Sequence, residues 1–134
     1  MFAFHENAAH GSCAFHLFVQ GPAANDVRSR SDNMLAEFSV VPLGKGESVS
    51  QYVAECVRIV HESGLDYRLN PMGTVVEGQY DQVMEVVKRC HMAVTAKCHR
   101  VITTIKIDDR IGAEGMMDGK MRSVEEKVGT KLKR

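Results

Sequence analysis

The sequence contains no tryptophan, and aromatic residues make up only 6% of its 134 residues. Proteins that bind single-stranded nucleic acids by base stacking need such rings on their surface. The 17 basic residues are matched by 17 acidic residues, so the chain also lacks the basic excess of a general nucleic-acid binder. No run of about 18 apolar residues is present, which excludes a transmembrane helix. We therefore expect neither nucleic acid nor a membrane as a partner.

Cysteine is also sparse, with four residues at positions 13, 56, 90 and 98 and no CxxC pair. Secreted domains held together by disulfides are usually richer in cysteine, so we expect free thiols and a cytoplasmic protein. Two Cys-His pairs begin at Cys90 and Cys98, but zinc ligands normally lie about two to four residues apart. We therefore expect no metal site.

The first 33 residues differ from the rest of the chain because neither a helical nor a strand period persists through them. Their short apolar segment lacks the positively charged flank of a secretory signal, and acidic residues argue against a mitochondrial presequence. A strongly patterned region begins at Met34. We interpret residues 1–33 as a poorly ordered extension and residues 34–134 as the working domain.

The patterned region predicts an α+β protein with the element order βαββαβ, because periods of two and of 3.6 residues alternate along it. The expected strands cover residues 35–41, 66–70, 74–78 and 100–108, and the expected helices cover about 48–62 and 80–96. This order is typical of the ferredoxin-like sandwich, in which two helices cover one face of a four-stranded antiparallel sheet. A short basic helix over about 119–129 is expected to close the chain.

Local signals specify the two expected helices further. Ser48 and Gln51 can form a capping box at the start of the first helix, and Ser63–Gly64 is a natural stop at its end. The expected apolar stripes are Val49, Val53, Cys56, Val57 and Val60 on the first helix and Val83, Val86, Val87, Cys90 and Val94 on the second. A tight turn is expected at Pro71-Met72-Gly73, between the two middle strands.

The second face of this sheet has no long helix to cover it and carries both apolar and polar residues. Leu35, Val41 and Ile102 are expected there beside Glu37 and Thr104. A domain of this size with half of a mixed sheet face uncovered usually associates through that face. We therefore expect the chain to bind copies of itself, as a dimer or a tetramer.

The segment Asn70–Gly78, NPMGTVVEG, carries a family resemblance together with the opening MLAEFSVVPLGKGESVSQYV and the closing RVITTIKIDDR. In this combination the chain resembles the small thiamine-binding protein family over about residues 34–129. These are one-domain ferredoxin-like proteins related to proteins that bind the hydroxymethylpyrimidine part of thiamine. The resemblance implies binding of thiamine or that pyrimidine, without catalysis or a further cofactor, and assembly into dimers and tetramers.

Thiamine offers an aminopyrimidine, a cationic thiazolium and a hydroxyethyl tail, so the resemblance points to six candidate ligand-binding residues. A carboxylate such as Glu77 can bind the amino group with charge-assisted strength, although Glu77 can equally pair with Lys106 on the sheet surface. The other candidates supply hydroxyl groups, an amide, a close backbone approach or a positive charge, or they only fit their strands and the turn. They are Ser39, Asn70, Gly73, Thr74 and Lys106.

Two other functions remain open from the residues alone. The first is a regulatory or scaffolding oligomer whose sheet face makes only protein contacts. The second is an enzyme, for which the sequence offers no convincing pair of titratable groups, and we therefore expect no catalysis. An acidic and basic cluster at Asp108–Arg110 is expected to dock the final helix through Lys120.

Deletion of residues 1–33 is predicted to leave the domain folded, because these residues lack periodicity and precede the family-like region. Thermal denaturation of the shortened and the full-length protein should give the same melting temperature. A loss of several degrees on deletion would show that the extension packs on the domain.

Overall fold

The computed structural model describes residues 32–133, so the expected extension lies almost wholly outside the described residues. The order of the elements is βαββαβ with a final helix, which confirms the predicted ferredoxin-like α+β fold. The elements are β1 (Asn33–Pro42), α1 (Ser50–Glu62), β2 (Asp66–Asn70), β3 (Gly73–Gln79), α2 (Tyr80–Thr95), β4 (Val101–Asp109) and α3 (Met116–Val128).

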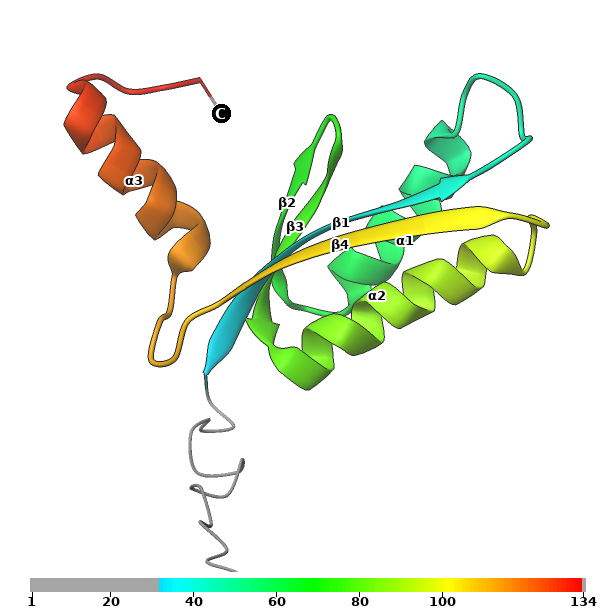
Figure 1. The fold of residues 1–134 in the computed structure, drawn as a ribbon, viewed down its shortest axis with the longest axis horizontal. Helices are drawn as coiled ribbons and strands as arrows, with labels where there is room; N and C mark the ends of the chain where they lie inside the picture. The colour runs from blue at the N-terminus through cyan, green and yellow to red at the C-terminus, as the bar shows by residue number, and fades with distance from the viewer. Residues whose placement is uncertain (1–31, 134) are drawn as a thin grey trace, which may run out of the picture.

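The four strands form one antiparallel sheet in the order β2-β3-β1-β4, with β1 paired to both β3 and β4. Helices α1 and α2 lie together on one face of this sheet, and α3 stands apart from them beyond one end of the strands (Figure 1). None of the three helices in the described part of the chain is long and apolar enough to span a membrane.

Strand β1 supplies the centre of the core through the alternation that its sequence predicts. Met34, Ala36, Phe38 and Val40 are buried against the helices, and the residues between them face the opposite side of the sheet. Because side chains alternate along a strand, this register fixes which residues of β3 and β4 share each face. We call the side without α1 and α2 the open face.

Helix α2 confirms its predicted apolar stripe completely. All five stripe residues are buried, and they recur at intervals of three or four positions: Val83, Val86, Val87, Cys90 and Val94. This spacing places them on one side of the helix, which packs on the sheet and on α1.

The buried stripe of α1 is rotated relative to the prediction. Tyr52, Cys56 and Val60 are buried, whereas Val53, which was expected on the stripe, is 37% exposed. The large ring of Tyr52 enters the core because it removes more apolar area from water than a valine does. Val53 instead borders a cavity that is described below.

The prediction for the start of α1 is wrong, and the prediction for its end is confirmed. The capping box expected from Ser48 and Gln51 does not form, because the helix begins at Ser50 and Val49 stands at the N-cap without a side-chain hydrogen bond. At the other end, the expected stop is present. The Ser63 hydroxyl donates to the Val60 carbonyl at 2.6 Å, and Gly64 has a φ of 72° that suits glycine.

Helix α3 is attached to the open face by a buried carboxylate. Glu77 lies on the open face, as its register opposite Leu35 shows, yet it is only 6% exposed. Its two oxygens accept hydrogen bonds from the backbone N–H groups of Met116 and Met117, at 2.8 and 2.9 Å. These groups begin α3 and have no partner within the helix, so Glu77 satisfies them and also complements the positive end of the helix dipole.

Two ion pairs at the surface support the same attachment. Arg68 of β2 lies 2.8 Å from Asp118, and Lys120 pairs with Asp108 of β4, which confirms the expected docking of the final helix through Lys120. The Lys120 ammonium lowers the pKa of the Asp108 carboxyl, through a hydrogen bond and through its charge. Exposed pairs of this kind contribute little, so the Glu77 contacts dominate.

Substitution of Glu77 by Gln is predicted to weaken the attachment of α3 by about 1.5–3 kcal/mol, the range for hydrogen bonds to a charged group. The amide keeps the shape of the side chain but replaces one acceptor oxygen with a donor that faces a backbone N–H group. Hydrogen exchange at the Met116 and Met117 amides, together with urea denaturation, measures the effect.

The matched control is Glu37→Gln on the same sheet face. The Glu37 side chain is 39% exposed and pairs only with the exposed Lys106, so its loss should change stability by less than about 0.5 kcal/mol. Equal exchange rates in the two variants would contradict the role assigned to Glu77.

Candidate functional site

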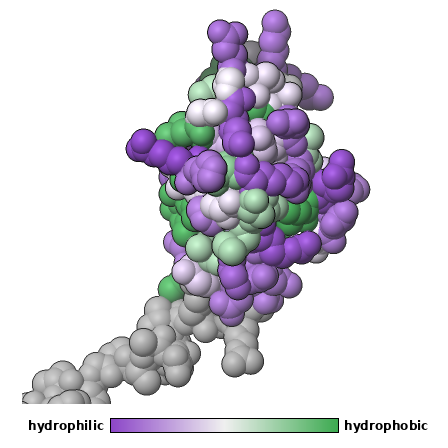
Figure 2. Space-filling model, turned by 90° about the vertical axis from the view of Figure 1, so that its right-hand side faces the viewer, coloured by the Kyte–Doolittle hydropathy of each residue, from purple (hydrophilic) through white to green (hydrophobic). Residues whose placement is uncertain are grey.

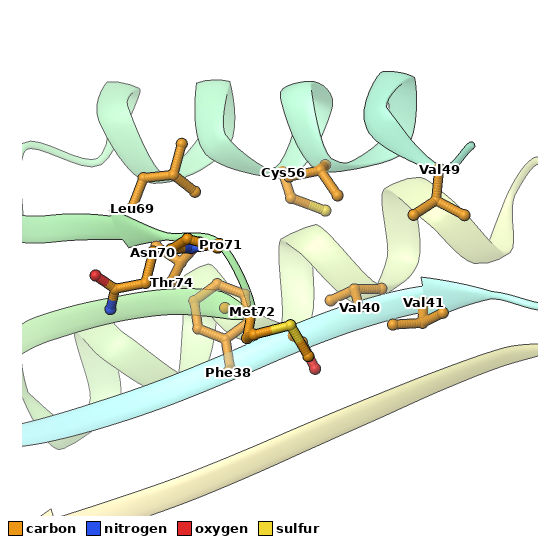
Figure 3. A pocket seen from close by; sticks show the side chains of 13 residues that line it. Phe38, Val40, Val41, Val49, Cys56, Leu69, Asn70, Pro71, Met72 and Thr74 are labelled. Carbon is orange, nitrogen blue, oxygen red and sulfur yellow. The ribbon is translucent and has the colours of Figure 1, made fainter. Parts of the chain in front are cut away.

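A cavity of about 260 Å³ lies between β1, α1 and the turn that joins β2 to β3 (Figure 3). Its walls come from residues 38–41 of β1, from Val49, Val53 and Cys56 at the start of α1, and from residues 69–74 of the hairpin. Ligand pockets commonly measure about 300–1000 Å³, so this cavity suits a small ligand of about one ring.

The cavity exists because β1 is longer than its neighbour on that side. Strand β3 begins at Gly73, and its pairing with β1 ends at the partners Phe38 and Thr74. Strand β1 continues to Pro42 and is paired there only with β4. The backbone edge of residues 39–41 therefore borders the cavity in place of another strand, and such an edge presents N–H and C=O groups.

The walls are mainly apolar, and none of the residues that line the cavity carries a charge. The polar side chains among them are Ser39, Asn70 and Thr74, together with the thiol of Cys56. Figure 3 shows Val49 and Cys56 projecting from α1 toward β1, with Phe38 and Met72 on the opposite side. The arrangement forms an apolar slot with a few hydrogen-bonding groups.

Thr74 is the best-placed hydroxyl group of this slot. It is 7% exposed, lies beside Phe38 on the helix-covered face, and lines the cavity. Within residues 32–133 its side chain makes no hydrogen bond to another residue. The hydroxyl group is therefore free to bind a polar group of a ligand that enters the cavity.

The three other predicted residues near the cavity contribute in different ways. Ser39 is paired with Thr104, has its side chain on the open face and is also one of the residues that line the cavity. The amide of Asn70 points away from Val49 and Cys56 in Figure 3, which places it toward the outside of the turn. Gly73 is constrained by the protein itself, since a Cβ atom there would lie 3.1 Å from the Phe38 carbonyl oxygen.

The two charged candidates lie elsewhere. Glu77 is bound to the first turn of α3, and its role toward a ligand stays a prediction. The alternative pairing of Glu77 with Lys106 is wrong, because Lys106 pairs with Glu37 at 2.5 Å. Lys106 lines a shallower hollow of about 440 Å³ on the open face, beside Asp108 and Lys120.

Sequence reasoning missed the contribution of α1 to the cavity. Val49, Val53 and Cys56 were all assigned to the core stripe of the helix, and their apolar spacing gave no signal that would separate a cavity wall from a core. The side chains that could stack on a flat ring also differ in where they lie. Phe38 and Met72 line the cavity, whereas Tyr52 lies in the core and Tyr67 contacts the His61 ring nitrogen at 3.2 Å.

The fold and the cavity define a ferredoxin-like protein with a small apolar slot beside its central hairpin. Comparison with known families specifies it further. The chain belongs to the thiamine-binding protein family, whose model matches residues 36–125. This match confirms the resemblance seen in the sequence and runs from within β1 to within α3.

Individual relatives agree with this assignment. A UPF0045 protein from Mycobacterium bovis is 44% identical over 94 residues, which cover 69% of this chain and 92% of that protein. The crystal structure of a hypothetical protein from Methanocaldococcus jannaschii matches with a TM-score of 0.67 at 36% identity, over 71% of this chain and 98% of that one.

A more distant structure supports the fold alone. A Thermotoga maritima protein, assigned provisionally to thiamine biosynthesis or salvage, has a TM-score of 0.57 at 22% identity, over 72% of this chain and 96% of that one. The first two matches support the family, and the third supports the fold.

Proposed function

We propose that the protein binds thiamine or its hydroxymethylpyrimidine moiety in the cavity between β1, α1 and the β2–β3 turn, without catalysis. The observation that carries this proposal is an apolar slot of about 260 Å³ whose wall includes Thr74, a 7% exposed residue whose hydroxyl makes no hydrogen bond within residues 32–133. Membership of the thiamine-binding protein family selects the ligand class.

The slot matches the chemistry of an aminopyrimidine. A flat ring fits between the apolar side chains of α1 and those of Phe38 and Val40. The edge of the ring carries donors and acceptors, which the Thr74 hydroxyl and the exposed backbone edge of β1 can bind. Apolar walls with a few convergent polar groups are typical of small-molecule sites.

The uncharged walls also determine which part of thiamine enters. Burying the cationic thiazolium among apolar side chains would be costly without a paired carboxylate, and no carboxylate of residues 32–133 lines the cavity. We therefore place the pyrimidine inside and the thiazolium at the mouth, near Met72, which is 87% exposed. The absence of a basic residue from the lining also means that a diphosphate group should add no affinity.

The same lining supports binding without catalysis, because none of the described residues that border the cavity carries an imidazole, amine or carboxylate. The described cysteines Cys56, Cys90 and Cys98 are free and buried, which supports the proposal of a cytosolic carrier or buffer.

Self-association through the open face completes the proposed function. Val41 and Ile102 are cross-strand partners on that face and are 37% and 48% exposed. By contrast, the side of the molecule shown in Figure 2 carries mostly hydrophilic side chains, with only small hydrophobic areas. Contact between two open faces would remove the exposed apolar pair from water.

Isothermal titration is predicted to show that hydroxymethylpyrimidine and thiamine bind, and that thiamine diphosphate binds no more tightly than thiamine. Thr74→Val, which keeps the shape of the side chain, should weaken binding by about 0.5–1.5 kcal/mol because one hydrogen bond is lost.

Thr104→Val serves as the control, because Thr104 lies in the same sheet but outside the cavity lining. The affinity of this variant for the ligands should equal that of the unmodified protein. Failure of the unmodified protein to bind any of the three ligands would overturn the proposal. Unchanged affinity in folded Thr74→Val would overturn the assigned position of the ring.

Light scattering at micromolar concentration is predicted to give a mass of two or four times 14.9 kDa. Ile102→Lys should lower this mass, since it places a charge in the proposed interface. Met92→Lys, at a residue of α2 that is 58% exposed, is the matched control and should leave the mass unchanged. A monomeric unmodified protein would refute association through the open face.

A further inference from the structure

Two cysteines face each other where α1 and α2 cross. The Cys90 thiol lies 3.5 Å from the Cys56 carbonyl oxygen, and the Cys56 thiol lies 3.8 Å from the Cys90 carbonyl oxygen. A carbonyl oxygen is only two bonds from its own Cα atom, so each sulfur reaches the backbone of the opposite cysteine. Disulfides require this kind of close, face-to-face approach of two cysteines.

The surroundings of the two thiols differ. Cys56 lines the cavity and is 7% exposed, whereas Cys90 is completely buried in the core. The hydrogen bond with Cys90 lowers the pKa of the Cys56 thiol, although burial and the nearby Glu55 oppose this effect. The same hydrogen bond and burial raise the pKa of the Cys90 thiol. Cys56 is therefore both the more accessible sulfur and the better nucleophile.

We propose that Cys56 and Cys90 form a dithiol–disulfide site that reacts with small disulfides entering through the cavity. This site does not depend on the proposed binding of thiamine. Its substrate class is a low-molecular-weight disulfide, RSSR, which acts as the oxidant.

The reaction proceeds by two exchanges. The Cys56 thiolate, formed by loss of its proton to solvent, attacks one sulfur of RSSR and releases RS⁻, which takes up a proton to become RSH. The Cys90 sulfur, after losing its own proton to solvent, then attacks the Cys56 sulfur. The S–S bond of the mixed disulfide between Cys56 and RS breaks, and a second RS⁻ leaves and is protonated. The two protein thiols lose two electrons in total, and RSSR is reduced to two RSH.

Simple packing is the alternative explanation, because buried cysteine also serves as a small apolar side chain where helices approach closely. Packing alone explains the burial of both residues, but it does not require one of the two sulfurs to lie in a cavity wall. The two explanations differ in whether the disulfide forms while the protein remains folded.

The test uses full-length Cys13→Ser/Cys98→Ser protein, in which Cys56 and Cys90 are the two remaining thiols. The folded protein is exposed to 2-hydroxyethyl disulfide, quenched in acid, unfolded and alkylated. We expect a mass lower by two hydrogens, no alkylation, and a reducible peptide pair joining Cys56 to Cys90. Because the link joins residues 34 positions apart, the melting temperature should also rise by several degrees.

Single variants in this background assign the roles. With Cys90→Ser the reaction should stop at a mixed disulfide on Cys56, whereas with Cys56→Ser the enclosed Cys90 should stay fully alkylatable. Alanine replaces serine in any variant that circular dichroism shows to be unfolded. The proposal is overturned if both thiols of the folded protein remain alkylatable, if the link forms only in denaturant, or if Cys90 reacts equally fast without Cys56.

Discussion

The unequal lengths of β1 and β3 are the constraint on which the cavity depends. Strand β1 must run the full length of the sheet because it pairs with β4 as far as Pro42. Strand β3 cannot follow it, since the hairpin with β2 turns at Pro71 and Met72 and β3 begins at Gly73. The close backbone approach at Gly73 holds the end of the hairpin against β1. The remaining edge of β1 and the first turns of α1 then enclose a slot that no side chain of the hairpin fills.

A second buried feature orders the opposite side of the sheet. The Glu77 carboxylate would be unfavourable under α3 without partners, and the first backbone N–H groups of α3 would be equally unfavourable without an acceptor. Each satisfies the other, so the position of α3 follows from one side chain of β3. The first turn of α3 lies at one end of the open face, and the apolar pair Val41 and Ile102 remains exposed toward the other end.

Periodicity predicted the fold because the interactions that define it are local or repeat along one element. The stripe of α2 and the alternation of β1 are complete in the sequence, and each indicates its own buried face. The turn at Pro71 and Met72 was predicted for the same reason. The prediction of a capping box at Ser48 was wrong because a capping box forms only if the helix begins directly after the capping residue. The helix begins at Ser50, one residue later than this prediction requires.

The site was less predictable because its geometry depends on residues that meet only in the folded chain. Glu77 contacts Met116, which lies 39 positions away in the chain, and no local sequence pattern around either residue predicts that contact. Thr74 could be identified as a candidate from the family-like segment, but the unpaired state of its hydroxyl depends on where β3 stops along β1. Val53 looked like a core residue, since an apolar cavity wall and an apolar core have the same periodicity.

Cys56 joins the two parts of the molecule that carry function in these proposals. Its side chain belongs to the cavity wall, and its sulfur also contacts the backbone of Cys90 across the helix crossing. A ligand in the slot and a disulfide at the crossing therefore act on the same turn of α1. Because Tyr52 and Val60 anchor α1 in the core on either side of Cys56, neither event requires the helix to move as a whole. A ligand in the proposed slot would therefore cover the Cys56 thiol and limit its contact with solvent and with a small disulfide.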